Sequence, residues 1–463
     1  MDIIEQLGDV VPAERLLAGS DSDDYSHDEC LTVSAVTPAV VVRPESTAEV
    51  AAVLAFADAE RIPVTARGAG TGLSGAATPG SDSIVVSFER MNKVLGIDTD
   101  NHVAVVQPGV RLNELDELTR ASGLMYPVYP GEYSASLGGN VATNAGGMRA
   151  VKYGVTRHQV LGLELVLPGG EVMRSGGKFV KASTGYDLTQ LVIGSEGTLA
   201  LVTEATLKLY PRPEHQATVL APFTTLEQVS DAVPRIVDSG LGPMVLEYID
   251  LLTMSAVQSF TGLELGIPQT VKDTALAYLV VMMENPIEQR LDEDTERLSE
   301  LLFALGAIDV YALPPSSAGD LIDAREKAFW MAKANGADDI IDIVVPRAQI
   351  PEFMERVSVL AGEYEAWIAG CGHAGDGSVH MGIFCSDPDR RSRLLTALFS
   401  AGMELGGAIS GEHGVGAAKK KYFNQLEDPA KIALMRRIKT AFDPNGILNP
   451  HILFDSAPHP HSH

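Results

Sequence analysis

Two histidines lie seven residues apart in a segment that is typical of a tight hairpin. His373 and His380 flank Gly375-Asp376-Gly377, whose residue types favour a sharp turn. Strand-like sequences lie on either side, at 366–371 and 381–384. A hairpin here would bring the two imidazoles together, and facing imidazoles can bind one divalent cation.

A second polar group lies in the glycine-rich segment 411–416. Glu412 and His413 are adjacent there, and glycines on both sides allow the backbone to come close to a ligand. Two histidines and one glutamate leave coordination positions open, as a catalytic metal site requires. Taken singly, each histidine could be a hydrogen-bonded structural residue, but the combination favours a metal site.

Three glycine-rich segments in the first half could bind a phosphorylated, flat, polar ligand. They cover residues 67–75, 136–147 and 194–199. Glycines let backbone N–H groups approach a diphosphate, and Thr71 and Ser74 add hydroxyl donors. The first segment does not have the G-x-G-x-x-G spacing, so a Rossmann site for NAD is a poor match.

The elements that must position these residues change in rhythm near residue 212. Before it, a helix begins at the capping box Ser46-Thr47-Ala48-Glu49, a hairpin is predicted over 161–174, and residues 131–154 are expected to be irregular. After it, strands and helices follow the order β-α-β-β-α-β, which is typical of a ferredoxin-like unit. We predict a domain over 1–212, a second over 213–405, and a segment over 406–463 that returns to the first. A disordered tail is expected from about 456.

Composition limits the classes of function. Lys plus Arg number 35 and Asp plus Glu number 61, a net charge of −26 that disfavours nucleic-acid binding. The longest apolar run, 275–283, is too short to span a membrane, and the N-terminus has no signal-peptide pattern. The 3 cysteines form no C-x-x-C motif, so an iron–sulfur cluster is not expected. These features favour a cytoplasmic protein, with peripheral membrane association and a homodimer both compatible.

The segments at 67–72, 138–140, 144–147 and 194–198 resemble the FAD-binding half of the vanillyl-alcohol-oxidase (PCMH-type) flavoproteins. The resemblance covers essentially the whole chain and is closest to the D-2-hydroxy-acid dehydrogenase branch, which includes D-lactate dehydrogenase, the glycolate oxidase catalytic subunit and D-2-hydroxyglutarate dehydrogenase. It implies an α+β fold, with a two-subdomain PCMH-type FAD-binding domain and a ferredoxin-like α+β substrate (cap) domain. Some members of the family attach FAD covalently through a histidine in these segments. No histidine lies in 67–75 or 130–147 of this chain, so we expect FAD to be bound non-covalently. The implied FAD contacts are Arg67, Gly68, Ala69, Gly70, Thr71, Gly72, Pro130, Ser136, Gly138, Gly139, Asn140, Thr143, Asn144, Gly146, Gly147, Glu196, Gly197 and Val202.

The same resemblance implies roles in the second half. His373, His380 and Glu412 match the ligands of a divalent metal, zinc or manganese, and His413 matches the catalytic base. The branch pattern is H-x-x-G-D-G-N-x-H. This chain has one residue instead of two between the first histidine and Gly-Asp-Gly, and Ser378 stands where Asn is usual.

Arg325 is predicted to lie on a helix. Taken alone, it could belong to a solvated helix face, whereas the resemblance places an arginine here against the substrate carboxylate. Hydroxyglutarate enzymes carry a lysine fifteen residues further on, where this chain has Ile340. A small monocarboxylic acid, D-lactate or glycolate, is therefore favoured.

The implied reaction is oxidation of the D-2-hydroxy acid to the 2-oxo acid. The metal assists loss of the hydroxyl proton to His413, and hydride passes to flavin N5. Electrons would then go to a quinone, an electron-transfer flavoprotein, a cytochrome, a separate iron–sulfur subunit or dioxygen. The alternatives are a D-2-hydroxyglutarate dehydrogenase, a non-redox enzyme resembling alkyl-dihydroxyacetone-phosphate synthase (whose run of adjacent histidines is absent), and a non-catalytic FAD-binding subunit of an oxidase complex.

Overall fold

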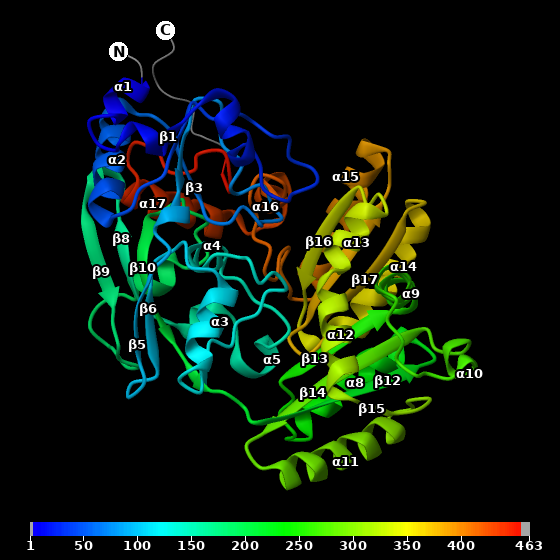
Figure 1. Cartoon of the computed structure of the whole chain (residues 1–463). Coiled ribbons are helices and arrows are strands. Elements are labelled where there is room, and N and C mark those ends of the chain that lie inside the picture. The colour runs from blue at the N-terminus through cyan, green and yellow to red at the C-terminus, as the bar shows by residue number, and fades with distance from the viewer. Residues whose placement is uncertain (1–2, 455–463) are drawn as a thin grey trace.

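The computed structural model describes residues 3–454 (Figure 1). The tail predicted from about residue 456 lies outside them. Two sheets form the half of the molecule at the left of Figure 1, and a larger sheet with its helices forms the half at the right. The mixture of helices and sheets in these two halves confirms the predicted α+β class.

The first sheet has the strand order β1-β2-β4-β3, and β2, β4 and β3 run parallel. The strands are β1 (Leu16–Leu17), β2 (Val40–Val42), β3 (Val64–Arg67) and β4 (Ile84–Ser87). Helix α2 (Thr47–Glu60) begins after Ser46, whose hydroxyl accepts a hydrogen bond from the Glu49 backbone N–H as the capping pattern predicts. The apolar side of α2 packs against this sheet and against Val166 and Leu201 of the second.

The second sheet is antiparallel, with the order β5-β6-β10-β8-β9. Its strands are β5 (Val94–Asp98), β6 (Val103–Val106), β8 (Val160–Val166), β9 (Val172–Gly176) and β10 (Leu201–Lys208). Strands β8 and β9 form the predicted hairpin. Helices α3 (Leu112–Arg120), α4 (Leu137–Thr143) and α7 (Leu188–Val192) contribute to its apolar core, while β7 (Leu124–Met125) and β11 (Tyr210–Pro211) pair separately.

The expectation that residues 131–154 are irregular was wrong for two parts of the segment, 137–143 and 150–153. They contain α4 and α5 (Ala150–Tyr153), and α6 (Thr156–Gln159) follows. Glycines disfavour a helix on their own, but the Ser136 hydroxyl caps α4 by accepting from the Gly139 N–H. A Cβ at Gly138 would lie 2.5 Å from the Pro108 Cβ, so glycine permits the close packing that holds this helix.

The third sheet has seven strands in the order β15-β12-β14-β13-β17-β18-β16. The first four have the order expected of the predicted ferredoxin-like unit, and β17, β18 and β16 extend its edge. The strands are β12 (His215–Phe223), β13 (Val245–Asp250), β14 (Ala277–Asn285), β15 (Tyr311–Leu313), β16 (Asp339–Val344), β17 (Trp367–His373) and β18 (Ser378–Phe384).

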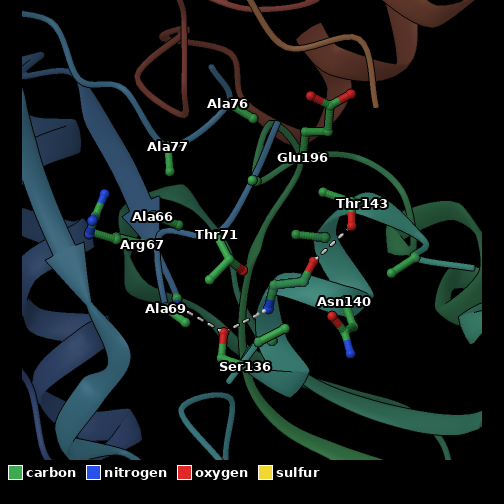
Figure 2. Close-up of a pocket in the computed structure, with 18 of the residues that line it drawn as sticks. Ala66, Arg67, Ala69, Thr71, Ala76, Ala77, Ser136, Asn140, Thr143 and Glu196 are labelled. Carbon is green, nitrogen blue, oxygen red and sulfur yellow. Dashed lines mark hydrogen bonds between the residues drawn. The ribbon is translucent and has the colours of Figure 1, made fainter. Parts of the chain in front are cut away.

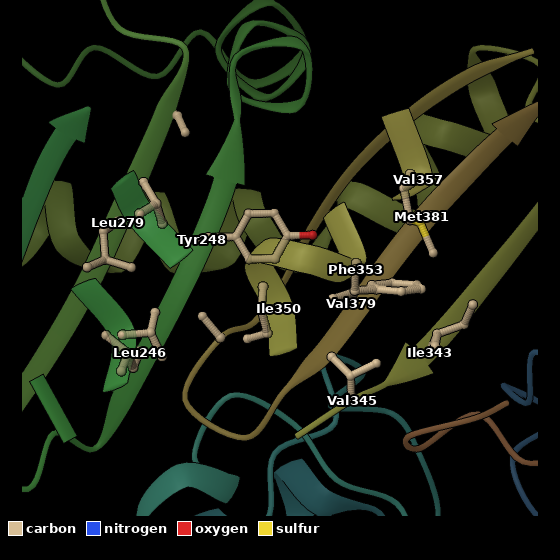
Figure 3. Close-up of a cluster of buried hydrophobic side chains, with 14 of the residues drawn as sticks. Leu246, Tyr248, Leu279, Ile343, Val345, Ile350, Phe353, Val357, Val379 and Met381 are labelled. Carbon is tan, nitrogen blue, oxygen red and sulfur yellow. The ribbon is translucent and has the colours of Figure 1, made fainter. Parts of the chain in front are cut away.

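Helices cover both faces of this seven-stranded sheet. On one face, α8 (Leu226–Asp238), α11 (Glu288–Ala304), α14 (Ile350–Glu363) and α15 (Pro388–Glu404) enclose the largest apolar core. Figure 3 shows part of this core, in which Tyr248, Phe353 and Val379 lie together. On the other face lie α9 (Leu251–Thr261), α12 (Pro315–Glu326) and α13 (Ala328–Ala334).

The last described part of the chain returns to the first sheet. It carries α16 (Lys420–Leu426) and α17 (Pro429–Phe442), drawn orange to red beside β3 in Figure 1. The Val64 N–H donates to the Ile447 carbonyl at 2.8 Å, and the Asn449 N–H donates to the Val64 carbonyl at 2.8 Å. The C-terminal segment therefore extends the edge of the sheet that leads into the first glycine-rich segment.

Candidate functional site

Four polar side chains lie in a row across four adjacent strands of the seven-stranded sheet. They are Glu247 on β13, His373 on β17, His380 on β18 and Asp342 on β16. The register places Asp342 opposite His380, and His373 contacts Glu247 at the other end of the row. Because side chains alternate along a strand, the residues on either side of each one face the apolar core, and this row faces away from it.

The two predicted metal-binding histidines meet across the hairpin that the sequence predicts. Strands β17 and β18 pair around the turn 374–377, and the centroids of the His373 and His380 rings lie 4.7 Å apart. The Glu412 Oε1 atom lies 3.3 Å from His373 Nε2 and 3.2 Å from His380 Nε2. Two donors bound to one zinc ion at the tetrahedral angle lie about 3.3 Å apart. The donor types and spacing therefore fit a divalent metal.

Glu247 supports this cluster from the strand beside His373. Its Oε1 atom lies 2.5 Å from His373 Nδ1, which directs the other ring nitrogen, Nε2, toward Glu412. A carboxylate behind a metal-binding imidazole fixes the ring and raises its basicity. Glu247 is fully buried, and nothing in the motifs pointed to it.

Asp342 positions the segment that carries Glu412 and His413. Its Oδ2 atom accepts hydrogen bonds from the backbone N–H groups of Gly411, Glu412 and His413 at 2.7, 2.6 and 3.1 Å. Its Oδ1 atom pairs with Lys419 and lies 3.3 Å from His413 Nδ1. One buried carboxylate therefore fixes three consecutive residues of a glycine-rich loop.

The surroundings of the three histidines shift their pKa values in different directions. Burial opposes it, but Glu247 and Glu412 raise the pKa of His373 well above its usual value. Burial lowers the pKa of His380 and of His413, so both imidazoles are held neutral. The carboxylates that favour a proton on His373 would equally favour a metal cation beside it.

Arg325 lies at the C-terminal end of α12 and is buried, with 8 % of its surface exposed. Its Nη2 atom lies 2.8 Å from Glu247 Oε2, but Nε and Nη2 have no hydrogen-bond partner within the described residues. The guanidinium faces the same cavity as His380 and His413. It is therefore placed to bind an anion there.

The glycine-rich segments enclose a separate cavity between the first two sheets (Figure 2). All of the predicted FAD contacts line it except Asn144, Gly146 and Gly147. The first two glycine-rich segments contact each other at one side of this cavity. The Ser136 hydroxyl accepts a hydrogen bond from the Ala69 N–H at 3.2 Å, and a Cβ at Gly68 would lie 2.1 Å from this hydroxyl oxygen.

The three exceptions lie just outside this cavity. Asn144 adopts a left-handed conformation after α4, and its side chain accepts from the Arg157 N–H. A Cβ at Gly146 would lie 2.8 Å from Glu412 Oε2, and one at Gly147 would lie 1.7 Å from the Tyr129 carbonyl oxygen. The structure thus places Gly146 against Glu412 of the histidine–glutamate cluster rather than on the cavity wall.

Two observations bear on how the cavity would hold FAD. Asn140 Nδ2 and Ser74 Oγ are buried on or beside its wall without hydrogen-bond partners in residues 3–454, which fits a polar ligand. Arg67 lies on the cavity wall, and its guanidinium donates to the backbone carbonyls of Asp24 and His27. Arg67 therefore shapes the cavity rather than offering a free cation.

A second cavity, of about 440 Å³, adjoins the first. It is lined by Arg325, His380 and Gly382 on the side of the seven-stranded sheet. Both cavities share Glu412 and His413 on their walls. A further link is Glu196, whose carboxylate accepts from the Val415 and Gly416 N–H groups at 2.8 Å each.

Comparison with known proteins identifies the family. Residues 38–176 match the family described as "FAD binding domain", and residues 212–452 match "FAD linked oxidases, C-terminal domain". The chain belongs to the FAD-linked oxidases. A protein of Mycobacterium tuberculosis named "Uncharacterized FAD-linked oxidoreductase Rv2280" is 58% identical over 98% of this chain and 99% of its own length. The D-lactate dehydrogenase of Anaerostipes hadrus is 37% identical over 97% of this chain and 96% of its own.

This FAD-linked oxidase shares its fold with a solved structure of p-cresol methylhydroxylase. The TM-score is 0.81, with 18% identity over 97% of this chain and 95% of the other. Together with the family matches, this confirms the resemblance to PCMH-type flavoproteins and to the D-2-hydroxy-acid dehydrogenase branch. The chain is an FAD-linked oxidoreductase.

Sequence reasoning missed two residues that contact the candidate site, although each is visible in the sequence as a carboxylate within an otherwise apolar strand. Glu247 lies in the run Val245–Asp250 and Asp342 in Asp339–Val344, both otherwise apolar inside their strands. A carboxylate in the interior of a buried strand is costly unless it is paired, so each marks a polar contact made by the fold.

Proposed function

We propose that this FAD-linked oxidase converts a D-2-hydroxy acid that has one carboxylate, such as D-lactate or glycolate, into the 2-oxo acid. The observation that carries the proposal is the position of His413. It lies on the walls of both cavities, and its ring centroid is 5.2 Å from that of His380. Bound FAD supplies the acceptor for the hydride that leaves the substrate carbon.

We further propose that His373, His380 and Glu412 hold a divalent metal, zinc or manganese. Such a cation supplies Lewis acidity, which favours loss of a proton from a nearby hydroxyl group. The support is the donor set, whose ligand atoms all lie within 4.8 Å of one another, together with Glu247 behind His373.

The protein side chains then have distinct tasks. Arg325 binds the substrate carboxylate through its guanidinium, whose Nε has no hydrogen-bond partner within the described chain and whose Nη2 is ion-paired with Glu247. His413 takes the hydroxyl proton at Nε2, because its Nδ1 faces Asp342. Burial keeps this imidazole neutral by lowering its pKa, so it is ready to accept a proton.

Three alternatives are less well supported. Hydroxyglutarate carries a second carboxylate, yet Arg325 is the one Lys or Arg on the described wall of the second cavity. A non-catalytic FAD-binding subunit would not need the assembled cluster and His413. A non-redox flavin enzyme is at odds with membership of an oxidoreductase family.

No helix in residues 3–454 has the length and apolar character needed to cross a bilayer. The electron acceptor would be an external quinone, flavoprotein, cytochrome or iron–sulfur partner.

The test is anaerobic addition of D-lactate or glycolate to the purified FAD-loaded protein. We expect bleaching of the flavin absorption band. The His413→Ala variant should retain FAD but reduce it at least about 100-fold more slowly, since a positioned base contributes about 10²–10⁴ in rate. His215→Ala, on strand β12 away from both cavities, is the matched control. Undiminished reduction by His413→Ala would remove the assigned role.

A further inference from the structure

The second cavity as a whole is much larger than a lactate molecule needs. Its volume of about 440 Å³ lies within the range of cavities that enclose drug-sized ligands. Glu412, His413, Thr71 and Pro130 are shared with the glycine-rich cavity and mark the end nearest the FAD site. Leu73 and Glu132 are shared as well, Glu29 and Gly131 come from the first domain, and the rest of the wall comes from the cap domain.

The cap-domain end of this cavity is apolar. It is lined by side chains of α9, α13, β17 and β18, none of which touches the glycine-rich cavity: Leu252, Ala256, Phe329, Trp330, Trp367 and Phe384. The Phe329 and Trp330 rings pack edge to face, with centroids 5.1 Å apart. Leu252, Trp330 and Trp367 are exposed by 50%, 40% and 72%, so large apolar surface here is left uncovered.

The inner end of the cavity carries a cationic side chain. Arg325 lies there, and the described part of the wall has no other Lys or Arg. Lys333 Nζ lies 5.1 Å from the centroid of the Trp330 ring, and it is neutralised by an ion pair at 2.7 Å with Glu29, which also lines the cavity. Glu132 also lines the cavity, so a second substrate carboxylate near it would meet like charge. The cavity thus offers one anion site and one extended apolar surface.

We propose that, among the 2-hydroxy acids with one carboxylate named above, the preferred substrate has a bulky apolar side chain, branched aliphatic or aromatic, and that D-lactate and glycolate react more slowly. The inference rests on the proposed function and names the class of its substrate. Arg325 binds the carboxylate, and the side chain lies between α9, α13 and β17. Apolar side chains bind more tightly in proportion to the surface they bury, so the unfilled space penalises D-lactate and glycolate.

Both tryptophans of the chain, Trp330 and Trp367, lie on this wall, so intrinsic fluorescence reports its occupancy directly. The probes are 3-phenylpropionate and propionate, which lack the hydroxyl group and cannot be oxidised. With FAD-loaded protein, we expect 3-phenylpropionate to change the emission with a Kd at least about tenfold below that of propionate, since even one added methylene can change discrimination by about 10-fold.

Two variants test the location. Ala256→Phe narrows the apolar end from α9 and should lower the preference for 3-phenylpropionate over propionate at least about fivefold, a loss equivalent to part of one methylene contact. Ser255→Phe adds the same ring at the adjacent exposed position, off the cavity wall, and should leave the preference unchanged. Equal binding of the two probes, or an equal effect of the two variants, would overturn the proposal.

Anaerobic flavin reduction separates this inference from the proposed function. Faster reduction by D-phenyllactate and D-2-hydroxyisocaproate than by D-lactate, glycolate or D-2-hydroxyglutarate supports both. Faster reduction by D-lactate or glycolate, with no binding preference for 3-phenylpropionate, overturns the substrate class and leaves the function standing. A binding preference without reduction by any hydroxy acid overturns the function and, with it, the assignment of a substrate.

Discussion

The Oδ2 atom of Asp342 lies 2.6 Å from the backbone nitrogen of Glu412 and accepts its N–H. The partner atoms lie on a buried strand and on a glycine-rich loop 70 residues later. This contact joins the sheet that carries His373 and His380 to the loop that supplies the third member of the cluster.

Replacing Asp342 by Asn should destabilise the fold by about 3–5 kcal/mol, because Lys419 would be left buried without its counter-charge. The free energy of unfolding in denaturant gives the measurement. The exposed Asp320→Asn serves as control. Adding Lys419→Met to Asp342→Asn should recover part of the loss. A single variant no less stable than the control would show that the pair does not hold this loop.

Replacing Glu247 by Gln should weaken divalent-metal binding by about 10–100-fold, because His373 would lose the carboxylate behind Nδ1. Competition with a chromogenic chelator measures the affinity of the purified protein for zinc and manganese. Glu164→Gln removes another buried carboxylate, on β8, and should leave the affinity unchanged. Equal affinities for all three proteins would contradict the role given to Glu247.

Replacing Arg325 by Lys should lower kcat/KM for the hydroxy acid by about 10–100-fold, because an ammonium cannot reproduce the planar fork. Steady-state assays with a soluble electron acceptor measure the change. In Arg325→Ala, added guanidinium should restore part of the activity if the side chain acts by binding the substrate carboxylate. A lack of rescue together with an unchanged KM would argue for a purely structural arginine.

Stability should depend on pH through Asp339. Burial, partly offset by the Ile340 N–H, raises its pKa from 3.8 to about 6. The folded state therefore binds more protons than the unfolded state between about pH 4 and 6, and stability falls as the pH rises through this window. Asp339→Asn should raise the Tm at pH 7 and have little effect near pH 4. A Tm difference that is the same at both pH values would refute this account.

Local patterns predicted much of the fold. The β-α-β-β-α-β unit follows from regular apolar spacing in β12, α8, β13, β14, α11 and β15, and the turn Gly375-Asp376-Gly377 predicts the β17–β18 hairpin. The addition of this hairpin to the edge of β13 depends on a contact between strands more than 120 residues apart, such as Ile249 with Cys371. No local pattern reports such a pairing.

The sequence predicted only those residues of the candidate site that belong to recognisable motifs. His373, His380, Glu412 and His413 carry recognisable spacing, and the structure brings them together. Glu247 and Asp342 act through contacts made only after the sheet has formed, so spacing along the chain does not reveal them. Helix α4 was missed because glycine-rich sequence has low helix propensity, and packing against Pro108 outweighs it.

The return of the C-terminal segment has a consequence for biosynthesis. Leu448 pairs beside Val64, and the Asn449 side chain donates to the carbonyls of Ala76 and Glu196. Domains made first usually fold first as a chain leaves the ribosome. Here the earliest sheet gains its closing partner only after the cap has been translated, so nascent chains should capture flavin only once the cap has been made.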